Sequence, residues 1–200
     1  MQNVLLIFIR NPQLGKVKTR LAHTLGDEEA LRIYQILLEK TRETAEACDA
    51  KRFLYYSEFI EENDEWHPDF FQKKVQYPGA LGERMEDAFE RAFQSGAHKV
   101  AIIGSDCPEL TPSVLQQAFN LLASADFVLG PASDGGYYLL GMKTFEPTVF
   151  RGLDWSTETV LQKTIEKIKT CNKSYALLPT LIDVDTEEDW RALARKKIIS

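Results

Sequence analysis

The fold is decided by the stretch Val100-Ala101-Ile102-Ile103-Gly104-Ser105-Asp106-Cys107-Pro108. Its first four residues are apolar, which is typical of a central strand in a covered sheet. Pro108 cannot continue such a strand and biases Cys107 toward an extended backbone, so the strand ends close to Asp106. In open α/β sheets, ligands bind beyond the carboxyl ends of the strands. The sequence therefore places Asp106 where a ligand is expected.

Outward from this strand, short apolar runs alternate with longer stretches whose apolar residues lie three and four apart. This alternation predicts an α/β protein with a mainly parallel sheet flanked by helices. The expected strands are 4–9, 53–56, 100–103, 127–129 and 137–140, with a last extended segment at 175–184. The expected helices are 30–45, 85–96, 111–122 and 160–168, followed by a closing helix. We interpret 58–79 as a loop with a short strand near Val75.

Composition narrows the class of protein. The chain has 200 residues, 44% of them hydrophobic, which predicts one domain spanning residues 1–200. A net charge of -6 argues against nucleic acid as a partner, because binding its phosphate backbone requires many clustered Lys and Arg residues. The apolar run Val4–Ile9 is too short to span a membrane and lacks a signal-peptide cleavage pattern. The three cysteines form no C-x-x-C pair, so we expect reduced thiols and a cytoplasmic location.

Asp106 is the central candidate for chemistry. One or two carboxylates often hold Mg²⁺ or Mn²⁺ while substrate phosphates and water complete the coordination shell. The sequence therefore predicts a Mg²⁺ or Mn²⁺ site at Asp106. The alternative is a turn aspartate that bonds nearby backbone amides.

A second acidic element, Asp183-Val184-Asp185-Thr186, ends the last extended segment. Alternation along a strand places Asp183 and Asp185 on one face, where they could add a carboxylate to the same metal. Thr186 followed by Asp189 is close to a capping box, so Asp185 or Thr186 could instead start the final helix. Both interpretations of Asp185 stay open.

Three cations lie in the loop after the first strand. Lys16, Lys18 and Arg20 lack the glycine spacing of a P-loop. They could still neutralise a diphosphate as it becomes a leaving group, which makes Lys18 a catalytic as well as a binding candidate. If this segment is helical, Lys16 and Arg20 share a face. The alternative is a solvated basic surface.

The segment Asp134-Gly135-Gly136-Tyr137 lies between two expected strands. An Asp-Gly pair is typical of a hairpin turn, which would account for it structurally. Adjacent glycines also allow close backbone approach to a ligand, while an acid and a tyrosine suit sugar hydroxyls and a planar ring. Asp134 is therefore a second catalytic candidate, and Gly135, Gly136 and Tyr137 are binding candidates.

Two weaker candidates complete the set. Gly82 and Arg84 stand at the start of an expected helix, whose free amides favour an anion. Trp155 precedes N-cap hydroxyls, and its ring could pack in the core, form part of a lid, or serve as a platform for a sugar.

Together these motifs resemble the radical-SAM/selenodomain-associated transferases, a bacterial family formerly described as a domain of unknown function. That family lies within the nucleotide-diphospho-sugar transferase (GT-A) superfamily. The motifs occur in order along almost the whole chain: 16–21, 82–85, 104–108, 130–137, 155–157 and 183–186. The resemblance implies a mixed, mainly parallel sheet with a nucleotide pocket over its first half. It also implies that Lys16, Lys18 and Arg20 take the place of the phosphate-binding loop, with Asp106 and Asp185 as metal ligands.

Three functions follow as hypotheses. The first is glycosyl transfer from a nucleotide-linked donor to a small-molecule acceptor, in which metal and cations stabilise the departing nucleoside diphosphate. The second is nucleotidyl transfer, in which a substrate phosphate attacks a nucleoside triphosphate and pyrophosphate leaves. The third is a non-catalytic nucleotide-binding module.

Overall fold

The computed structural model describes residues 2–196 and 198. Its centre is a seven-stranded sheet in the order β3-β2-β1-β4-β6-β5-β7. Strand β6 is antiparallel to both of its neighbours, and every other pairing is parallel. The strands are β1 (Asn3–Ile9), β2 (Lys51–Tyr56), β3 (Gln72–Val75), β4 (Lys99–Ile103), β5 (Phe127–Pro131), β6 (Tyr137–Met142) and β7 (Tyr175–Leu177). The predicted α/β class with a mixed, mainly parallel sheet is confirmed.

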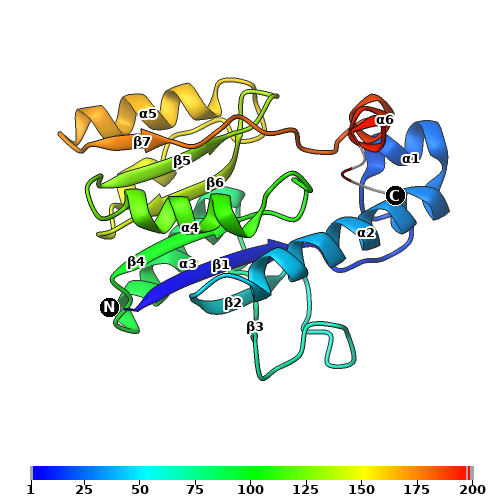
Figure 1. Cartoon of the computed structure of the whole chain (residues 1–200), viewed down its shortest axis with the longest axis horizontal. Helices are drawn as coiled ribbons and strands as arrows, with labels where there is room; N and C mark the ends of the chain where they lie inside the picture. The colour runs from blue at the N-terminus through cyan, green and yellow to red at the C-terminus, as the bar shows by residue number, and fades with distance from the viewer. Residues whose placement is uncertain (1, 197, 199–200) are drawn as a thin grey trace.

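Helices lie on both sides of this sheet (Figure 1). They are α1 (Thr19–Leu25), α2 (Asp27–Glu46), α3 (Leu81–Gln94), α4 (Pro112–Leu121), α5 (Val160–Thr170) and α6 (Glu187–Arg195), with a short 3-10 helix at Pro147–Phe150. One hydrophobic cluster packs α2 and α4 on one face, and a second packs α3 and α5 on the other. The apolar run of β1 follows from this arrangement, because side chains on both of its faces are buried.

A third cluster lies beyond the sheet and joins the two ends of the chain. Leu21 of α1, Ile33 and Leu37 of α2, Val184, and Leu193 of α6 are all buried there. Figure 1 shows α1 and α6 side by side past the carboxyl end of β1. This packing brings the segment before α6 to the loop that follows β1.

The elements differ from the prediction in α1, a helix not predicted from the sequence, and near the C-terminus. Only Tyr175–Leu177 of the predicted extended segment pairs as a strand, and Leu181 adds an isolated bridge to Ala132. The short strand expected near Val75 is present as β3, at the edge of the sheet. No helix within the described ranges has the length and apolar character needed to cross a membrane.

Candidate active site

The loop after β4 is held in place from two directions. Ser105 is buried, and its hydroxyl lies 3.2 Å from the hydroxyl of Tyr34 on α2. The backbone N–H of Val184 donates to the carbonyl oxygen of Asp106 at 2.8 Å. With its backbone fixed, Asp106 keeps a side chain that is 45% exposed. The carboxylate therefore lies at the carboxyl end of β4 and faces outward, as the sequence predicts.

Lys18 joins this carboxylate to the C-terminal segment. Its Nζ lies 2.7 Å from Oδ1 of Asp106 and 3.5 Å from Oδ1 of Asp185, and it donates to the carbonyl oxygen of Val184 at 2.6 Å. The side chain is only 6% exposed. Lys18 also has φ of 47°, a left-handed backbone that is uncommon for residues other than glycine. Three acceptors thus match the three N–H donors of an ammonium group.

Asp185 is not the cap of the final helix. The hydroxyl of Thr186 accepts from the N–H of Asp189, whose carboxylate in turn accepts from the N–H of Thr186, so these two residues form the capping box. Asp185 instead pairs through Oδ2 with Arg20 at 3.2 Å. Thr186 and not Asp185 therefore caps the helix, and the metal-ligand role of Asp185 stays a prediction.

Asp183 lies deeper than Asp185. Its Oδ1 is buried and has no hydrogen-bond partner among the described residues. Burial, followed by the nearby carboxylates of Asp106 and Asp134, raises the pKa of Asp183 to about 7. The pKa of the neighbouring Cys107 thiol is raised by burial and by Asp183. The ammonium of Lys18 therefore lies among Asp106, Asp185 and Asp183, and Asp134 lies near Asp183.

The predicted trio of cations does not stay together. Lys16 pairs with Glu58 at 3.6 Å, whereas Lys18 and Arg20 contact Asp185. The shared face of Lys16 and Arg20 depended on this segment being helical, and that condition is not met because α1 begins only at Thr19. The left-handed backbone at Lys18 lies between Lys16 and the start of α1, which carries Arg20.

The turn between β5 and β6 confirms the hairpin interpretation of Asp134-Gly135. Oδ1 of Asp134 accepts from the N–H of Gly136 at 2.8 Å, and Gly135 has φ of +88°. A Cβ added to Gly135 would lie 2.1 Å from the carbonyl oxygen of Glu158. The glycine thus makes room for protein backbone, and a ligand role for Gly135 and Gly136 stays a prediction. The side chain of Asp134 is exposed and near Asp183.

Gly82, Tyr137 and Trp155 lie together in the packing beneath the 150–157 loop. A Cβ on Gly82 would lie 2.5 Å from the indole nitrogen of Trp155, and Tyr137 packs edge-on to that ring at 6.4 Å. The hydroxyl of Tyr137 is buried with no partner in the described part of the chain. Arg84 donates to the carbonyl of Gly79 at 2.6 Å and so orders the loop before α3. These contacts give all four residues structural roles, and their predicted ligand roles stay untested.

The donor set suits a hard divalent cation that shares its coordination with a substrate. Among residues 2–196 and 198, no group of three or more His, Cys, Asp or Glu side chains is arranged to hold a metal. Asp106 and Asp185 nevertheless direct oxygens at one point, the ammonium of Lys18. Two carboxylates are enough for Mg²⁺ or Mn²⁺ when phosphates and water supply the other ligands. The residues present therefore fit such an ion.

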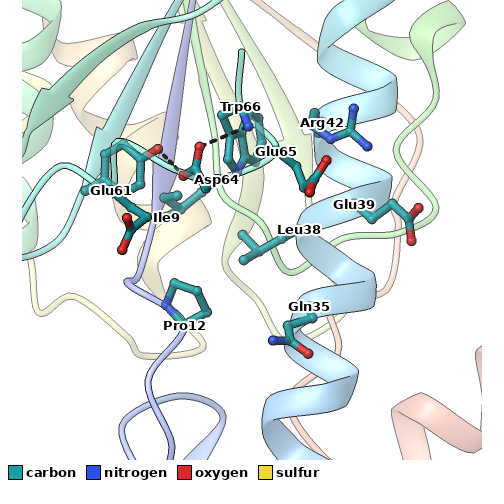
Figure 2. Close-up of a pocket in the computed structure, with 11 residues that line it drawn as sticks. Ile9, Pro12, Gln35, Leu38, Glu39, Arg42, Glu61, Asp64, Glu65 and Trp66 are labelled. Atoms are coloured by element: carbon teal, nitrogen blue, oxygen red, sulfur yellow. Dashed lines mark hydrogen bonds between the residues drawn. The ribbon is translucent and has the colours of Figure 1, made fainter. Parts of the chain in front are cut away.

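A separate cavity of about 430 Å³ lies between the end of β1, α2 and residues 61–66 (Figure 2). Its wall includes Ile9 at the end of β1, Leu38 of α2 and Trp66. None of the predicted site residues lines it. The cluster of Asp106, Asp183 and Asp185 is thus distinct from this cavity.

Sequence reasoning missed the two groups that organise the site. The hydroxyl of Tyr34 accepts from the N–H of Arg10 at 2.8 Å and contacts Ser105, so it links the loops after β1 and β4. The carbonyl of Val184 is the shortest contact of Lys18. Tyr34 on the buried stripe of α2 was the one available signal, because a backbone carbonyl leaves no trace in a sequence.

A family model described as "Uncharacterized protein conserved in bacteria (DUF2064)" matches residues 40–157. That span is more than half of the chain. The chain belongs to the DUF2064 family. Among curated proteins, none matches this DUF2064 chain.

Solved structures extend the comparison. A crystal structure named "putative nucleotide-diphospho-sugar transferase", from Desulfovibrio desulfuricans G20, is 33% identical, with a TM-score of 0.91 over 98% of the DUF2064 chain and 88% of that chain. Rv0371c from Mycobacterium tuberculosis H37Rv, crystallised with manganese, is 15% identical, with a TM-score of 0.56 over 98% and 99%. CMP:2-keto-3-deoxy-manno-octonic acid synthetase complexed with CTP is 10% identical, with a TM-score of 0.57 over 98% and 100%. The fold is therefore that of the nucleotide-diphospho-sugar transferases.

Proposed function

We propose that this DUF2064 protein is a metal-dependent transferase that uses a nucleotide-linked donor, and that glycosyl transfer is its reaction. The observation that carries the proposal is the position of Lys18 between Asp106 and Asp185. The cluster combines oxygen ligands for a cation with side chains that attract phosphate, at the carboxyl ends of β1 and β4. The similarity to a protein named as a nucleotide-diphospho-sugar transferase supports the same class.

Asp106 and Asp185 would hold Mg²⁺ or Mn²⁺, which when bound supplies positive charge to the phosphates of the donor. In glycosyl transfer, a hydroxyl oxygen of the acceptor bonds to the anomeric carbon of the sugar. The bond from that carbon to the phosphate oxygen breaks, and the electron pair leaves with the nucleoside diphosphate. Lys18 and Arg20 would stabilise the charge that develops on this leaving group. Arg20 is 72% exposed and so can reach a ligand from the rim.

Asp134 would take the proton that the acceptor hydroxyl releases. Its Oδ1 is held by the N–H of Gly136, which orients the carboxylate. Its carboxylate raises the pKa of Asp183, which supports a position near that residue. A general base must lie within hydrogen-bond reach of the proton it removes, and this position would meet that requirement for an acceptor bound over β5 and β6.

Nucleotidyl transfer is the second candidate, favoured by the similarity to a synthetase complexed with CTP. A phosphate oxygen of the substrate would bond to the α-phosphorus of a nucleoside triphosphate, and pyrophosphate would leave with the electron pair. The same cations would then stabilise pyrophosphate. The two reactions differ in the leaving group and can be separated by it.

Calorimetric titration with UDP-sugars, CTP and GTP, each with Mg²⁺, tests the binding step. Phosphorus NMR of the same mixtures with sugar and sugar-phosphate acceptors then identifies the leaving group. Release of a nucleoside diphosphate supports glycosyl transfer, and release of pyrophosphate from a tightly bound triphosphate would replace it with nucleotidyl transfer. If Asp106→Asn leaves metal-dependent nucleotide binding unchanged, the catalytic proposal fails and a non-catalytic nucleotide-binding module becomes the better explanation.

A further inference from the structure

Lys18 occupies the point at which the carboxylates of Asp106 and Asp185 converge. We infer that Lys18 is an exchangeable internal cation, whose ammonium leaves these carboxylates for the nucleotide phosphates and thereby opens the pair to the divalent ion. This inference rests on the proposed function and adds a gating role for one of its residues. It predicts that nucleotide and metal bind cooperatively because both displace the same internal ion pair.

The geometry leaves little room for both cations in the same place. Nζ of Lys18 lies 2.7 Å from Oδ1 of Asp106 and 3.5 Å from Oδ1 of Asp185. A divalent ion on these oxygens lies about 2.1 Å from each of them, so the two positive charges would be close neighbours. Their repulsion is strong in a region where the lysine side chain is 6% exposed. Lys18 in this position therefore competes with the ion.

Phosphate oxygens can take over the contacts of Lys18. The ammonium sits on a flexible four-carbon stem and carries three donors, all of which are engaged by the two carboxylates and the carbonyl of Val184. A diphosphate offers several charged acceptors at once, so moving to it leaves no donor unsatisfied. Asp106 is then left without its cation, and Asp185 keeps only Arg20. Binding of nucleotide and of metal is thus coupled, and the coupling is reciprocal.

Without Lys18, the carboxylates of Asp106, Asp183 and Asp185 have too little positive charge near them. Asp106 would lose its ion-pair partner, Asp185 would keep only Arg20 at the rim, and Oδ1 of Asp183 has no partner within the described residues. Carboxylates crowded in this way repel one another and attract any available divalent ion. Lys18→Met, which keeps the length of the side chain but not its charge, should therefore bind metal without needing nucleotide.

The chain provides a matched control in Lys73. Its Nζ lies 2.7 Å from Oδ1 of Asp64 and 2.7 Å from the carbonyl oxygen of Glu61, and its side chain is 8% exposed. Asp64 also accepts from the hydroxyl of Tyr56, so it keeps a partner when the lysine is removed. Lys73→Met thus removes an equally buried lysine from a single carboxylate outside the proposed site.

Mn²⁺ binding, followed by electron paramagnetic resonance, tests the exchange. Without nucleotide, we expect Lys18→Met to bind Mn²⁺ about tenfold more tightly than the wild type, and Lys73→Met to match the wild type. In Lys18→Met/Asp106→Asn the gain should disappear. Lys18→Arg keeps a cation that forms a rigid fork on carboxylates, so its Mn²⁺ affinity should be no higher than that of the wild type. This comparison keeps the proposal testable if Lys18→Met does not fold.

Equal or weaker Mn²⁺ binding by Lys18→Met, or tighter binding by Lys18→Arg, overturns the exchange. Repeating the titration of the wild type with UDP and with CTP then separates the two proposals. Absence of Mn²⁺ binding in the presence of nucleotides found by calorimetry to bind would count against the proposed function. The nucleotide-free result for Lys18→Met would still decide whether the lysine and the metal compete.

Discussion

The backbone N–H of Val184 bonds to the carbonyl oxygen of Asp106 at 2.8 Å, and this bond joins the C-terminal segment to the end of β4. This backbone hydrogen bond sets Asp185 beside Lys18, and it involves neither the side chain of Asp106 nor that of Asp185. The side chain of Val184 is fully buried in the cluster formed by α1, α2 and α6. Packing between the first and last helices therefore positions the second carboxylate of the site.

Asp106→Asn is expected to weaken metal-dependent nucleotide binding by about tenfold or more. The change removes the charge of Asp106, one of the two proposed metal ligands, whose Oδ1 now contacts Lys18. Losing one charged contact to a bound ligand typically costs about 1.5–3 kcal/mol, which is roughly tenfold to a hundredfold in affinity. Calorimetric titration with nucleotide and Mg²⁺ measures it. Asp64→Asn, which breaks the remote pair with Lys73, is the control and should bind as the wild type does.

The position of Asp106 was predictable from sequence because two strong local signals agree. An apolar strand and the proline after Cys107 define where the strand ends, and the carboxyl edge of a parallel sheet is a general place for ligands. The pairing of Lys18 with Asp106 and Asp185, in contrast, could not be predicted from the sequence. It depends on the packing of α1 against α6, which joins residues far apart in the chain.

Other parts of the site could not be predicted, for physical reasons. A left-handed backbone at Lys18 sends Lys16 toward Glu58, and nothing in a Lys-Val-Lys sequence specifies that conformation. Gly82 and Gly135 lack a side chain because Trp155 and a backbone carbonyl approach them closely. A ligand that approached the same glycines would leave the same sequence.

The stability of the protein should fall in acid in a manner that depends on Asp126. Its carboxylate accepts from the hydroxyl and N–H of Ser174 at 2.6 and 2.8 Å and pairs with Lys143 at 3.3 Å. These contacts, the Ser174 hydroxyl foremost, lower the pKa of Asp126 from 3.8 to about 2. Because the folded pKa is the lower one, the stabilisation is present above the unfolded value and is lost as pH falls toward about 2.

We therefore expect the free energy of unfolding to drop by about 1 kcal/mol more in the wild type than in Asp126→Asn between these two pKa values. This is less than the full shift implies, because the side chain is 25% exposed. Urea unfolding at a series of pH values measures the difference. Parallel curves for the two proteins would show that the contacts of Asp126 contribute nothing to the acid response.

Gly135→Ala should destabilise the protein far more than Gly96→Ala. Both glycines have positive φ, +88° and +90°, so both substitutions carry a similar backbone penalty of roughly 1 kcal/mol. Only at Gly135 would the new Cβ meet another atom, the carbonyl oxygen of Glu158 at 2.1 Å. The backbone must then shift, and we expect a total loss of roughly 3 kcal/mol in chemical unfolding. Similar losses for both variants would mean that the Glu158 backbone yields easily, which would leave room for a ligand at this turn.

Two buried tyrosines should respond in opposite ways to loss of their hydroxyl groups. The hydroxyl of Tyr34 bonds the N–H of Arg10 at 2.8 Å and lies 3.2 Å from that of Ser105, whereas the hydroxyl of Tyr55 is buried with no partner among the described residues. Tyr34→Phe leaves buried polar groups unpaired, and we expect it to cost about 1–2 kcal/mol in urea unfolding.

Tyr55→Phe removes a group that gains nothing from burial, so its free energy of unfolding should stay the same or rise by up to about 1 kcal/mol. Because Ser105 adjoins Asp106, Tyr34→Phe should also weaken nucleotide binding in the presence of Mg²⁺, and Tyr55→Phe should not. A loss of stability in Tyr55→Phe equal to that in Tyr34→Phe would show that the Tyr55 hydroxyl has a bound water as its partner. Unchanged nucleotide binding in Tyr34→Phe would show that the loop after β4 keeps Asp106 in place without this hydroxyl.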